Sequence, residues 1–354
     1  MRTGAPPAGR LLMVGLPGPA LGALAARLLA RLRPGGVILF RRNVESEAQL
    51  LALVGDVRRR APEALLFVDA EGGRVDRLAP VVGPAPAASR LAQAPPTWSR
   101  RAGLWVGRGL RYFGFDVDLA PVVDLDRGGR GNALDGRCLG ARPAAVAARG
   151  RAFLHGLEAA GVAGCVKHFP GLGGAGEDTH YRGAVVSLDA EALAADLRPF
   201  ALLATQAAAV LVGHAAYPAL DPGGLPASLS PAIAGHLLRR RLSFRGLAIS
   251  DDLEMRALGE WGSLPEVAAA ALAAGCDLLP VCHSLEGALE VAARLSRPRL
   301  AERAREAGGR LRRYRRHLGR LRRLARHPES LAAVQRRLRD LDEALAAGAR
   351  PFTR

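Results

Sequence analysis

The sequence is short of lysine and cysteine, and each shortage narrows what the protein can be. Of its 50 basic residues only Lys167 is a lysine, and the other 49 are arginines. Either this lysine survives by chance, or a compact ammonium group is needed there that a planar guanidinium cannot replace. The four cysteines are scattered and form no CxxC pair. This argues against a disulfide framework or a cysteine zinc site, and it favours a reducing, cytoplasmic compartment.

Long hydrophobic runs are also missing. No uninterrupted apolar stretch reaches the ~20 residues that a membrane helix requires. The apolar residues 11–30 follow Arg2 and Arg10, a pattern that resembles a signal peptide. Pro17 and Pro19 interrupt this run. We therefore expect a strand followed by a helix there, with a signal peptide as the alternative.

Short apolar runs rich in β-branched residues alternate with stretches rich in alanine and leucine. Eight strands are predicted, at residues 11–16, 36–40, 64–69, 115–119, 163–168, 209–214, 246–251 and 277–282. Helices are predicted at residues 20–32, 46–60, 98–112, 144–160, 190–205, 230–240, 263–274 and 285–296. This alternation indicates an α/β protein with a single (β/α)8 TIM-type barrel over residues 1–298, rather than a doubly wound open sheet.

The net charge of +17 is concentrated near the C-terminus. Residues 294–339 contain 17 arginines against three acidic residues, which leaves about +3 for the rest of the chain. We therefore do not expect the barrel to bind nucleic acid. Residues 299–354 are predicted to form an Arg-rich helical extension packed on the barrel or trailing from it. Its apolar stripe consists of Leu311, Leu318, Leu321 and Leu324. Binding to nucleic acid or to an anionic surface is the alternative.

Polar residues recur at the C-terminal ends of the predicted strands, where barrels of this type carry their chemistry. They are Asp69, Asp118, Lys167, His168, His214 and Asp251. Each strand is otherwise apolar, so we expect these side chains to meet at one rim of the barrel.

The stretch KHFPGLGGAGEDTHYRG, residues 167–183, is the most specific of the chain. It leaves a strand with Lys167 and His168, crosses a glycine-rich loop and ends on Asp178-x-His180. Such a loop suits a catalytic group that must move, and an adjacent carboxylate can orient an imidazole and tune its pKa. A metal site is the alternative, although no second His–carboxylate pair supports it.

Two further stretches place carboxylates at strand ends. AISDDLEM, residues 248–255, ends a strand on Asp251, which should point into the barrel mouth, while Asp252 should turn aside to cap the next helix. Alternatively, both residues only cap. FVDAEGGRVDRL, residues 67–78, ends a strand on Asp69 and turns at two glycines to present Arg74 and Arg77, a combination suited to binding sugar hydroxyls.

Together these stretches resemble glycoside hydrolase family 3, and within it the small bacterial β-N-acetylglucosaminidases of peptidoglycan recycling. The resemblance covers most of the chain and rests on the order and spacing of its motifs. They are GGVILF (35–40), Asn43, DAEGGRVDR (69–77), DLAPVVDL (118–125), GRCLG (136–140), KHFPG (167–171), D-x-H (178–180), GH (213–214) and SDDLEM (250–255).

The resemblance implies a role for each matching residue. Asp251 stands at the position of the nucleophile, His180 at that of the acid/base, and Asp178 at that of the carboxylate beside it. The non-reducing N-acetylglucosamine would be held by Asp69, Arg77, Arg137, Lys167 and His168. The enzyme would be a retaining exo-β-N-acetylglucosaminidase that acts on GlcNAc-anhydro-muropeptides through a covalent glycosyl-enzyme, as a monomer and without a metal or other cofactor.

The sequence also departs from the family pattern. Leu172 stands where the family usually has histidine, Gly174-Ala175 replace Asp-Thr, and GRCLG replaces GRSFG. Two other functions therefore stay open. One is a family-3 glycosidase for another sugar, such as glucose or xylose. The other is a sugar-binding or interaction protein on an inactive barrel.

Overall fold

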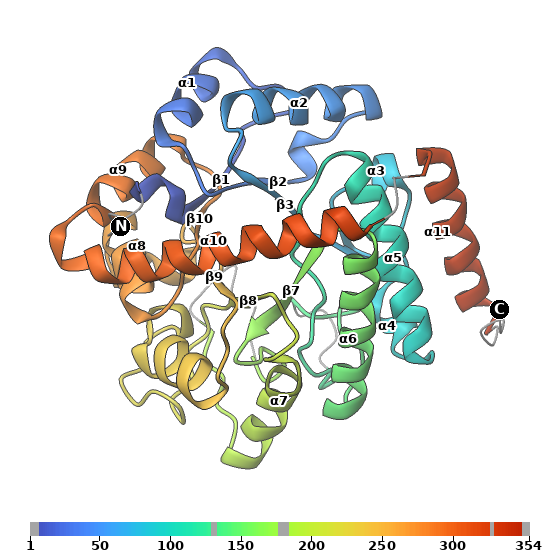
Figure 1. The fold of residues 1–354 in the computed structure, drawn as a ribbon. Coiled ribbons are helices and arrows are strands. Elements are labelled where there is room, and N and C mark those ends of the chain that lie inside the picture. The colour runs from blue at the N-terminus through green and yellow to red at the C-terminus, as the bar shows by residue number, and fades with distance from the viewer. Residues whose placement is uncertain (1–6, 129–132, 176–183, 326–328, 349–354) are drawn as a thin grey trace.

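The computed structural model describes residues 7–128, 133–175, 184–325 and 329–348. Eight parallel strands form one sheet in the order β10-β1-β2-β3-β6-β7-β8-β9. Their bounds are β1 (Leu12–Gly15), β2 (Gly36–Leu39), β3 (Leu65–Val68), β6 (Val117–Asp118), β7 (Ala163–Phe169), β8 (Ala209–Val212), β9 (Leu247–Ser250) and β10 (Leu279–Val281). A single parallel bridge between Ile249 and Leu278 joins the two edges. The sheet is therefore a nearly closed barrel, as predicted (Figure 1).

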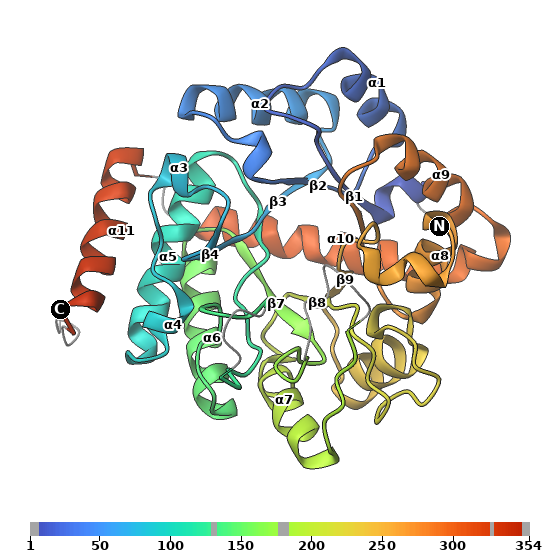
Figure 2. The same ribbon diagram turned by 180° about the vertical axis from the view of Figure 1, so that it is seen from behind.

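Helices surround this barrel, one after almost every strand (Figure 2). The long ones are α1 (Ala23–Leu32), α2 (Glu47–Arg60), α5 (Pro96–Tyr112), α6 (Pro143–Ala159), α7 (Ala190–Leu203), the π-helix η4 (Pro231–Arg241), α8 (Leu264–Ala274) and α9 (Leu285–Leu295). Short ones are η1 (Ala8–Leu11), η2 (Arg41–Asn43), α3 (Ala79–Val82), α4 (Ala88–Leu91), η3 (Ala227–Leu229), η5 (Arg256–Trp261) and η6 (Pro298–Leu300). All eight predicted helices are present.

Polar residues fix where several helices begin. The side chains of Ser46, Asp189, Ser230 and Ser284 accept hydrogen bonds from the free backbone N–H groups of the first turn. Helix α8 begins with a capping box formed by Ser263 and Glu266. These caps fix the first residue of the five helices α2, α7, η4, α8 and α9.

A short hairpin after β3 was not expected. Strands β4 (Ala70–Gly72) and β5 (Val75–Asp76) pair antiparallel, where the sequence indicated only a tight turn. Gly72 (φ 88°) and Gly73 (φ 59°) make the reversal, and a Cβ atom at Gly72 would lie 2.3 Å from the carbonyl oxygen of Pro86. The hairpin folds the acidic and basic residues of this segment back over the barrel mouth.

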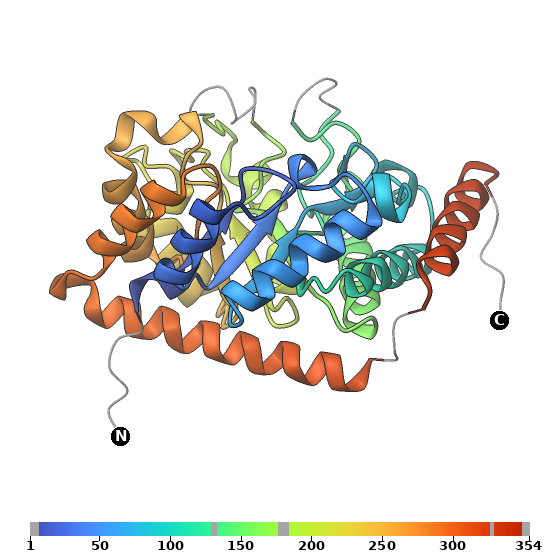
Figure 3. The same ribbon diagram turned by 90° about the horizontal axis from the view of Figure 1, so that it is seen from above.

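Helix α10 (Ala301–Leu324) crosses the opposite end of the barrel, where the strands start (Figure 3). Leu311, Tyr314 and Leu318 belong to the same buried cluster as barrel residues such as Phe67 and Ile249. Leu324 was expected on this apolar stripe but is 84% exposed, because α10 ends there and has passed beyond the barrel. The helix therefore closes this end with three side chains that the strands alone would leave uncovered.

Helix α11 (Leu331–Ala346) lies outside the barrel, beside α5 (Figure 1). Its buried residues are Leu331, Val334, Leu338 and Leu341, which repeat at helical spacing on one face. None of the helices in the described ranges has the length and apolar character that a membrane crossing needs.

Candidate active site

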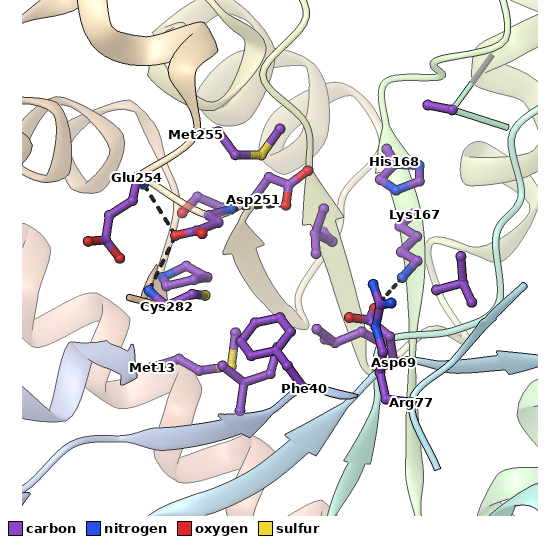
Figure 4. Close-up of a pocket in the computed structure, with 18 of the residues that line it drawn as sticks. Met13, Phe40, Asp69, Arg77, Lys167, His168, Asp251, Glu254, Met255 and Cys282 are labelled. Carbon is purple, nitrogen blue, oxygen red and sulfur yellow. Dashed lines mark hydrogen bonds and ion pairs between the residues drawn. The ribbon is translucent and has the colours of Figure 1, made fainter. Parts of the chain in front are cut away.

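A pocket of about 550 Å³ opens at the C-terminal ends of the strands (Figure 4). Its lining includes six of the eight predicted site residues: Asp69, Arg77, Arg137, Lys167, His168 and Asp251. Lys167 and His168 lie in β7, whereas Asp69, Arg137 and Asp251 follow β3, β6 and β9, and Arg77 follows the β4–β5 hairpin. Residues far apart in the sequence therefore meet here. The other two, Asp178 and His180, lie outside the described residues.

Asp251 immediately follows the last residue of β9, a strand that is buried along its whole length. Its backbone N–H still donates to the carbonyl oxygen of Val212 on β8, at 2.9 Å, so it continues the sheet and its side chain enters the pocket. Its Oδ1 atom accepts a hydrogen bond from the backbone N–H of Asp252, at 2.9 Å. Burial by itself would raise the pKa of Asp251, but His214, His168 and Lys167 outweigh it and hold the pKa below its ordinary value.

Asp252 behaves differently from its neighbour. It was expected to cap the next helix, but η5 begins at Arg256 without a side-chain cap and α8 is capped by Ser263. Instead, Oδ1 of Asp252 accepts from the backbone N–H groups of Cys282 and Glu254, at 3.3 and 3.2 Å. Burial raises its pKa to about 6, and the carboxylates of Glu254 and Asp251 add to this rise. The pKa values of these two adjacent acids thus shift in opposite directions, and Asp251 is the stronger acid of the pair.

Lys167 lies at the centre of an ion-pair network on the wall formed by β3 and β7. Its Nζ atom is 2.6 Å from Oδ1 of Asp69 and 2.7 Å from Oε1 of Glu71, and its side chain is 3% exposed. Burial alone would lower the pKa of this ammonium, but the two carboxylates raise it above its ordinary value. The only lysine of the chain is therefore a charged, desolvated group that faces the pocket.

Glu71 joins this lysine to Arg137. Nε and Nη2 of Arg137 donate to the two carboxylate oxygens of Glu71, at 2.8 and 2.7 Å. Burial would raise the pKa of Glu71, but Lys167 and Arg137 bring it down to about 2. The bidentate pair restricts both the distance and the angle between Arg137 and Glu71. Because Glu71 also contacts Lys167, it fixes the guanidinium and the ammonium relative to each other.

His168 is held by a second buried carboxylate, Asp124. Its Nδ1 lies 2.7 Å from Oδ2 of Asp124, and its backbone N–H donates to the same oxygen at 3.1 Å. The backbone N–H of Leu172 also donates to Asp124, at 2.8 Å. Asp124 therefore orients both the imidazole and the first turn of the glycine-rich loop. The Nε2 atom of His168 is left toward the pocket, 3.5 Å from Nη2 of Arg137.

Arg77, Arg74 and Asp118 were also expected at the site, and they lie at three different positions. Arg77 lines the pocket, and its backbone N–H donates to the carbonyl oxygen of Asp69 at 3.0 Å. Arg74 also lines the pocket, where its Nη2 donates to the carbonyl oxygen of Ala133 at 2.6 Å. Asp118 was expected at the rim but lies buried beneath it, where its Oδ1 accepts from the backbone N–H of Ala70 at 3.0 Å. Its function is to hold the hairpin rather than to face the pocket.

The sequence did not single out Glu71, Asp124 or Ser228, although Glu71 and Asp124 fix groups of the pocket and Ser228 fixes His214, a predicted rim residue that lies buried outside the pocket lining. Ser228 lies 2.8 Å from Nδ1 of His214, whose Nε2 is 2.9 Å from the carbonyl oxygen of Asp252. Glu71 and Asp124 stand inside the motifs at 69–77 and 118–125, so a search for a partner of the single lysine could have found Glu71. Ser228 lies in the short helix η3, outside the motifs quoted from the sequence, and left no signal there.

The arrangement sets one ionised carboxylate beside a wall of fixed donors and acceptors. In Figure 4, Asp251 projects from the end of β9 while Lys167 and His168 project from β7, with Asp69 and Arg77 beside them. Such a wall suits a ligand with several hydroxyl groups, and a free carboxylate beside it can attack or stabilise a cationic carbon. No group of three or more side chains that could hold a metal ion occurs in the described ranges.

Comparison with known proteins decides between the families that could use this pocket. The model of the glycosyl hydrolase family 3 N-terminal domain matches residues 8–305. The chain belongs to glycosyl hydrolase family 3. A β-hexosaminidase of Methylococcus capsulatus is 38% identical over 288 residues, which are 79% of this chain and 84% of that protein.

Solved structures of this family agree in fold. A family-3 β-N-acetylglucosaminidase of Paenibacillus sp. is similar with a TM-score of 0.86 and 30% identity, over 94% of this chain and 67% of that one. NagZ of Neisseria gonorrhoeae in complex with N-trifluoroacetyl-D-glucosamine gives a TM-score of 0.78 and 29% identity, over 99% and 100% of the two chains. This family-3 protein is therefore a glycoside hydrolase of the bacterial β-N-acetylglucosaminidase type.

Proposed function

We propose that the protein is a retaining exo-β-N-acetylglucosaminidase that uses Asp251 as its nucleophile. The observation that carries the proposal is the position of Asp251 at the end of β9, where its side chain lines the same pocket as the fixed hydrogen-bonding groups Lys167 and His168 and its pKa lies below the ordinary value. An ionised carboxylate is required for attack on the anomeric carbon, and its neighbour Asp252 has its pKa shifted the other way.

The proposed reaction is a double displacement. Asp251 attacks the anomeric carbon while His180 gives a proton to the departing glycosidic oxygen, so that a covalent glycosyl-enzyme forms and the aglycone leaves. Water then attacks the same carbon, His180 accepts its proton, and Asp251 is released. Asp178 would orient the imidazole of His180. A neutral base avoids repulsion with the carboxylate that leaves in the second step.

The terminal sugar would be bound by Asp69, Arg77, Arg137, Lys167 and His168. The network through Glu71 supports this assignment, because it fixes the ammonium and the guanidinium before any ligand arrives. A hydroxyl that meets preorganised charged groups is bound without the cost of ordering them.

We further propose that the natural substrates are GlcNAc-anhydro-muropeptides, and that the enzyme acts in the cytoplasm as a monomer. The four cysteines are all free and buried, which agrees with a reducing compartment. We also propose that residues 1–298 form the catalytic barrel and residues 299–354 its extension. Support for the extension comes from the position of α10 across the barrel end.

Substrate choice is tested with three nitrophenyl glycosides. We expect hydrolysis of the N-acetyl-β-glucosaminide and little hydrolysis of the β-glucoside or β-xyloside. Preference for the glucoside would favour the alternative family-3 glycosidase, and an absence of turnover on all three would favour a sugar-binding protein on an inactive barrel.

The acid/base assignment is tested by the leaving group. In His180→Ala, cleavage of a dinitrophenyl aglycone should be slowed little, because this group leaves unprotonated, whereas a sugar aglycone should lose ~10²–10⁴-fold. Azide should restore turnover by attacking the intermediate without a base. The exposed His155 on α6 offers a matched control, His155→Ala, that should change neither rate. Equal losses on both aglycones without azide rescue would refute the role of His180.

A further inference from the structure

A second pocket lies at the other end of the barrel from Asp251, between helices η4 and α10. It measures about 720 Å³, and its lining includes the loops that precede β9 and β10. Six arginines line it, Arg239, Arg240, Arg245, Arg303, Arg310 and Arg313, together with a single carboxylate, Glu306. We call this the arginine pocket. It shares no lining residue with the candidate active site.

Three of these arginines converge on one buried carboxylate, Asp277. Nη2 of Arg303 is 2.7 Å and Nη1 of Arg310 is 3.1 Å from its Oδ1, while Arg239 pairs with Oδ2. The backbone N–H of Ala248 occupies Oδ2 as well, at 3.0 Å. Asp277 is fully buried and its acceptor capacity is used, so it cannot neutralise a fourth cation.

The guanidiniums around Asp277 are themselves incompletely satisfied. The buried Nε of Arg239 and Nη1 of Arg303 lack a hydrogen-bond acceptor among the described residues. Burial lowers the pKa of Arg239, and Arg310 and Arg303 lower it further, against the opposing effect of Asp277. Glu306 approaches Arg303 and Arg310 only at 3.7 and 3.6 Å.

The other three arginines have no structural task that the contacts reveal. Arg240, Arg245 and Arg313 are exposed, and no ion pair engages them within the part of the chain that is described. Docking of α10 is accounted for by Asp277 and the apolar cluster, and neither needs them. Six guanidiniums thus surround this pocket with two carboxylates, an excess of four positive charges.

We propose that the arginine pocket binds a compact polyanion of the phosphate class, such as a diphosphate or triphosphate group. Guanidinium forks match phosphoryl oxygens in bidentate geometry, and one monovalent anion would leave most of the charge excess in place. A concave site of this volume fits a small ligand. An extended nucleic-acid strand would instead use arginines along the whole exposed face of α10.

Calorimetric titration of the full-length protein with inorganic pyrophosphate, at constant ionic strength, tests the proposal. Saturable binding is expected, and Arg313→Gln and Arg245→Gln should each weaken it about 10-fold or more, the loss of a charged hydrogen bond. Arg316→Gln removes the same charge from an exposed position on α10 outside the pocket and should leave the affinity unchanged. Each variant's thermal midpoint shows that it folds.

Three results would overturn the proposal. The first is an absence of saturable binding to the wild-type protein. The second is equal weakening by Arg316→Gln, or displacement of pyrophosphate by a short single-stranded oligonucleotide at far lower concentration, since either result indicates general attraction of polyanions to the arginine-rich helix. The third is competitive inhibition of glycoside hydrolysis by pyrophosphate, which would place the anion in the active-site pocket instead.

Discussion

Both ends of this barrel contain buried carboxylates that are held by cations: arginines alone at one end, and Lys167 together with Arg137 at the other. Where the strands start, Asp277 and Asp116 are held by arginines, three around the first and Arg58 and Arg322 around the second. Apolar residues of α10 fill the space between them. Where the strands end, Lys167 bridges Asp69 and Glu71 beside an open pocket.

The buried carboxylates of the closed end stabilise the fold, whereas Asp251 at the open end is placed to take part in the reaction. At the closed end each arginine contacts its buried carboxylate through one guanidinium nitrogen, and these pairs hold a helix in place. At the open end, Asp251 accepts a hydrogen bond from Asp252, and no ion pair engages it within the described ranges. Its negative charge is maintained by His214, His168 and Lys167 without direct pairing. A nucleophile needs this combination of stable charge and an unoccupied oxygen.

The largest effect is expected at Asp251. Because Asp251→Ala removes the atom that would form the covalent bond, turnover should fall by about 10⁴-fold or more. Its thermal midpoint should stay near that of the wild type, since no ion pair is lost. Kinetics on the nitrophenyl N-acetylglucosaminide and a melting curve measure both. A variant that keeps a tenth of wild-type activity would remove Asp251 from the mechanism and make Asp252 the candidate.

Matched substitutions at the two ends should separate stability from activity. Asp277→Asn leaves three partly buried arginines without their carboxylate and should cost about 3–5 kcal/mol in the free energy of unfolding. Its kcat/KM should not change, because α10 lies at the opposite end of the barrel from the active-site pocket. Glu71→Gln should cost a similar stability but should also lower kcat/KM about 10²-fold, since Lys167 and Arg137 lose their common anchor.

The pH dependence of the unfolding free energy tests whether ionised Glu71 stabilises the protein. Its folded pKa of about 2 lies below the ordinary value of 4.5, so its ionised form stabilises the protein above pH 4.5 and this contribution is lost as the pH falls toward 2. The stability gap between wild type and Glu71→Gln should therefore shrink from pH 6 to pH 3 in urea unfolding. A gap independent of pH, or a loss of kcat/KM in Asp277→Asn, would contradict the proposed division between the two ends.

Lys167→Arg should damage activity although it conserves the charge. The ammonium fits between two carboxylates at 2.6 and 2.7 Å in a site that is 3% exposed, and a larger planar guanidinium must displace one of them. Misplacement of this kind costs about 10²-fold in kcat/KM. Arg316→Lys, at an exposed position, is the reverse exchange and should have no effect. A kcat/KM for Lys167→Arg within threefold of wild type would mean that the lysine is not specifically required.

Two leucines of α10, one packed on the barrel and one beyond it, should differ in their effect on the free energy of unfolding. Leu318 is 3% exposed inside the barrel cluster, so Leu318→Ala should lower the free energy of unfolding by about 2–3 kcal/mol. Leu324 is 84% exposed, so Leu324→Ala should change it by less than about 0.5 kcal/mol. Chemical denaturation of the two variants compares them directly. Equal effects would show that α10 is not seated as described.

The sequence predicted the strands and helices well because hydrophobic periodicity is a local property. The eight strands and eight long helices lie within a few residues of their predicted positions. The β4–β5 hairpin was missed because its two short strands surround glycines that also fit a simple turn. Leu324 was assigned wrongly because periodicity does not reveal where a helix leaves the surface on which it packs.

The site was predicted less completely, for a different reason. Residues at strand ends, such as Asp251 and Lys167, could be identified because position along a strand determines the rim. The capping role expected for Asp252 was wrong, since its partner Cys282 comes from a distant segment. Glu71 and Asp124 act by holding other residues, and such partners become visible only in three dimensions.

Trapping the covalent intermediate tests directly whether Asp251 is the nucleophile. A 5-fluoro N-acetylglucosaminyl fluoride forms such an intermediate rapidly and releases it slowly, so mass spectrometry of the digested protein can locate the sugar. We expect one equivalent of sugar, bound to the peptide that contains Asp251 and absent from Asp251→Ala. A label on any other residue, or turnover with no adduct and an inverted anomeric product in the NMR spectrum, would contradict it.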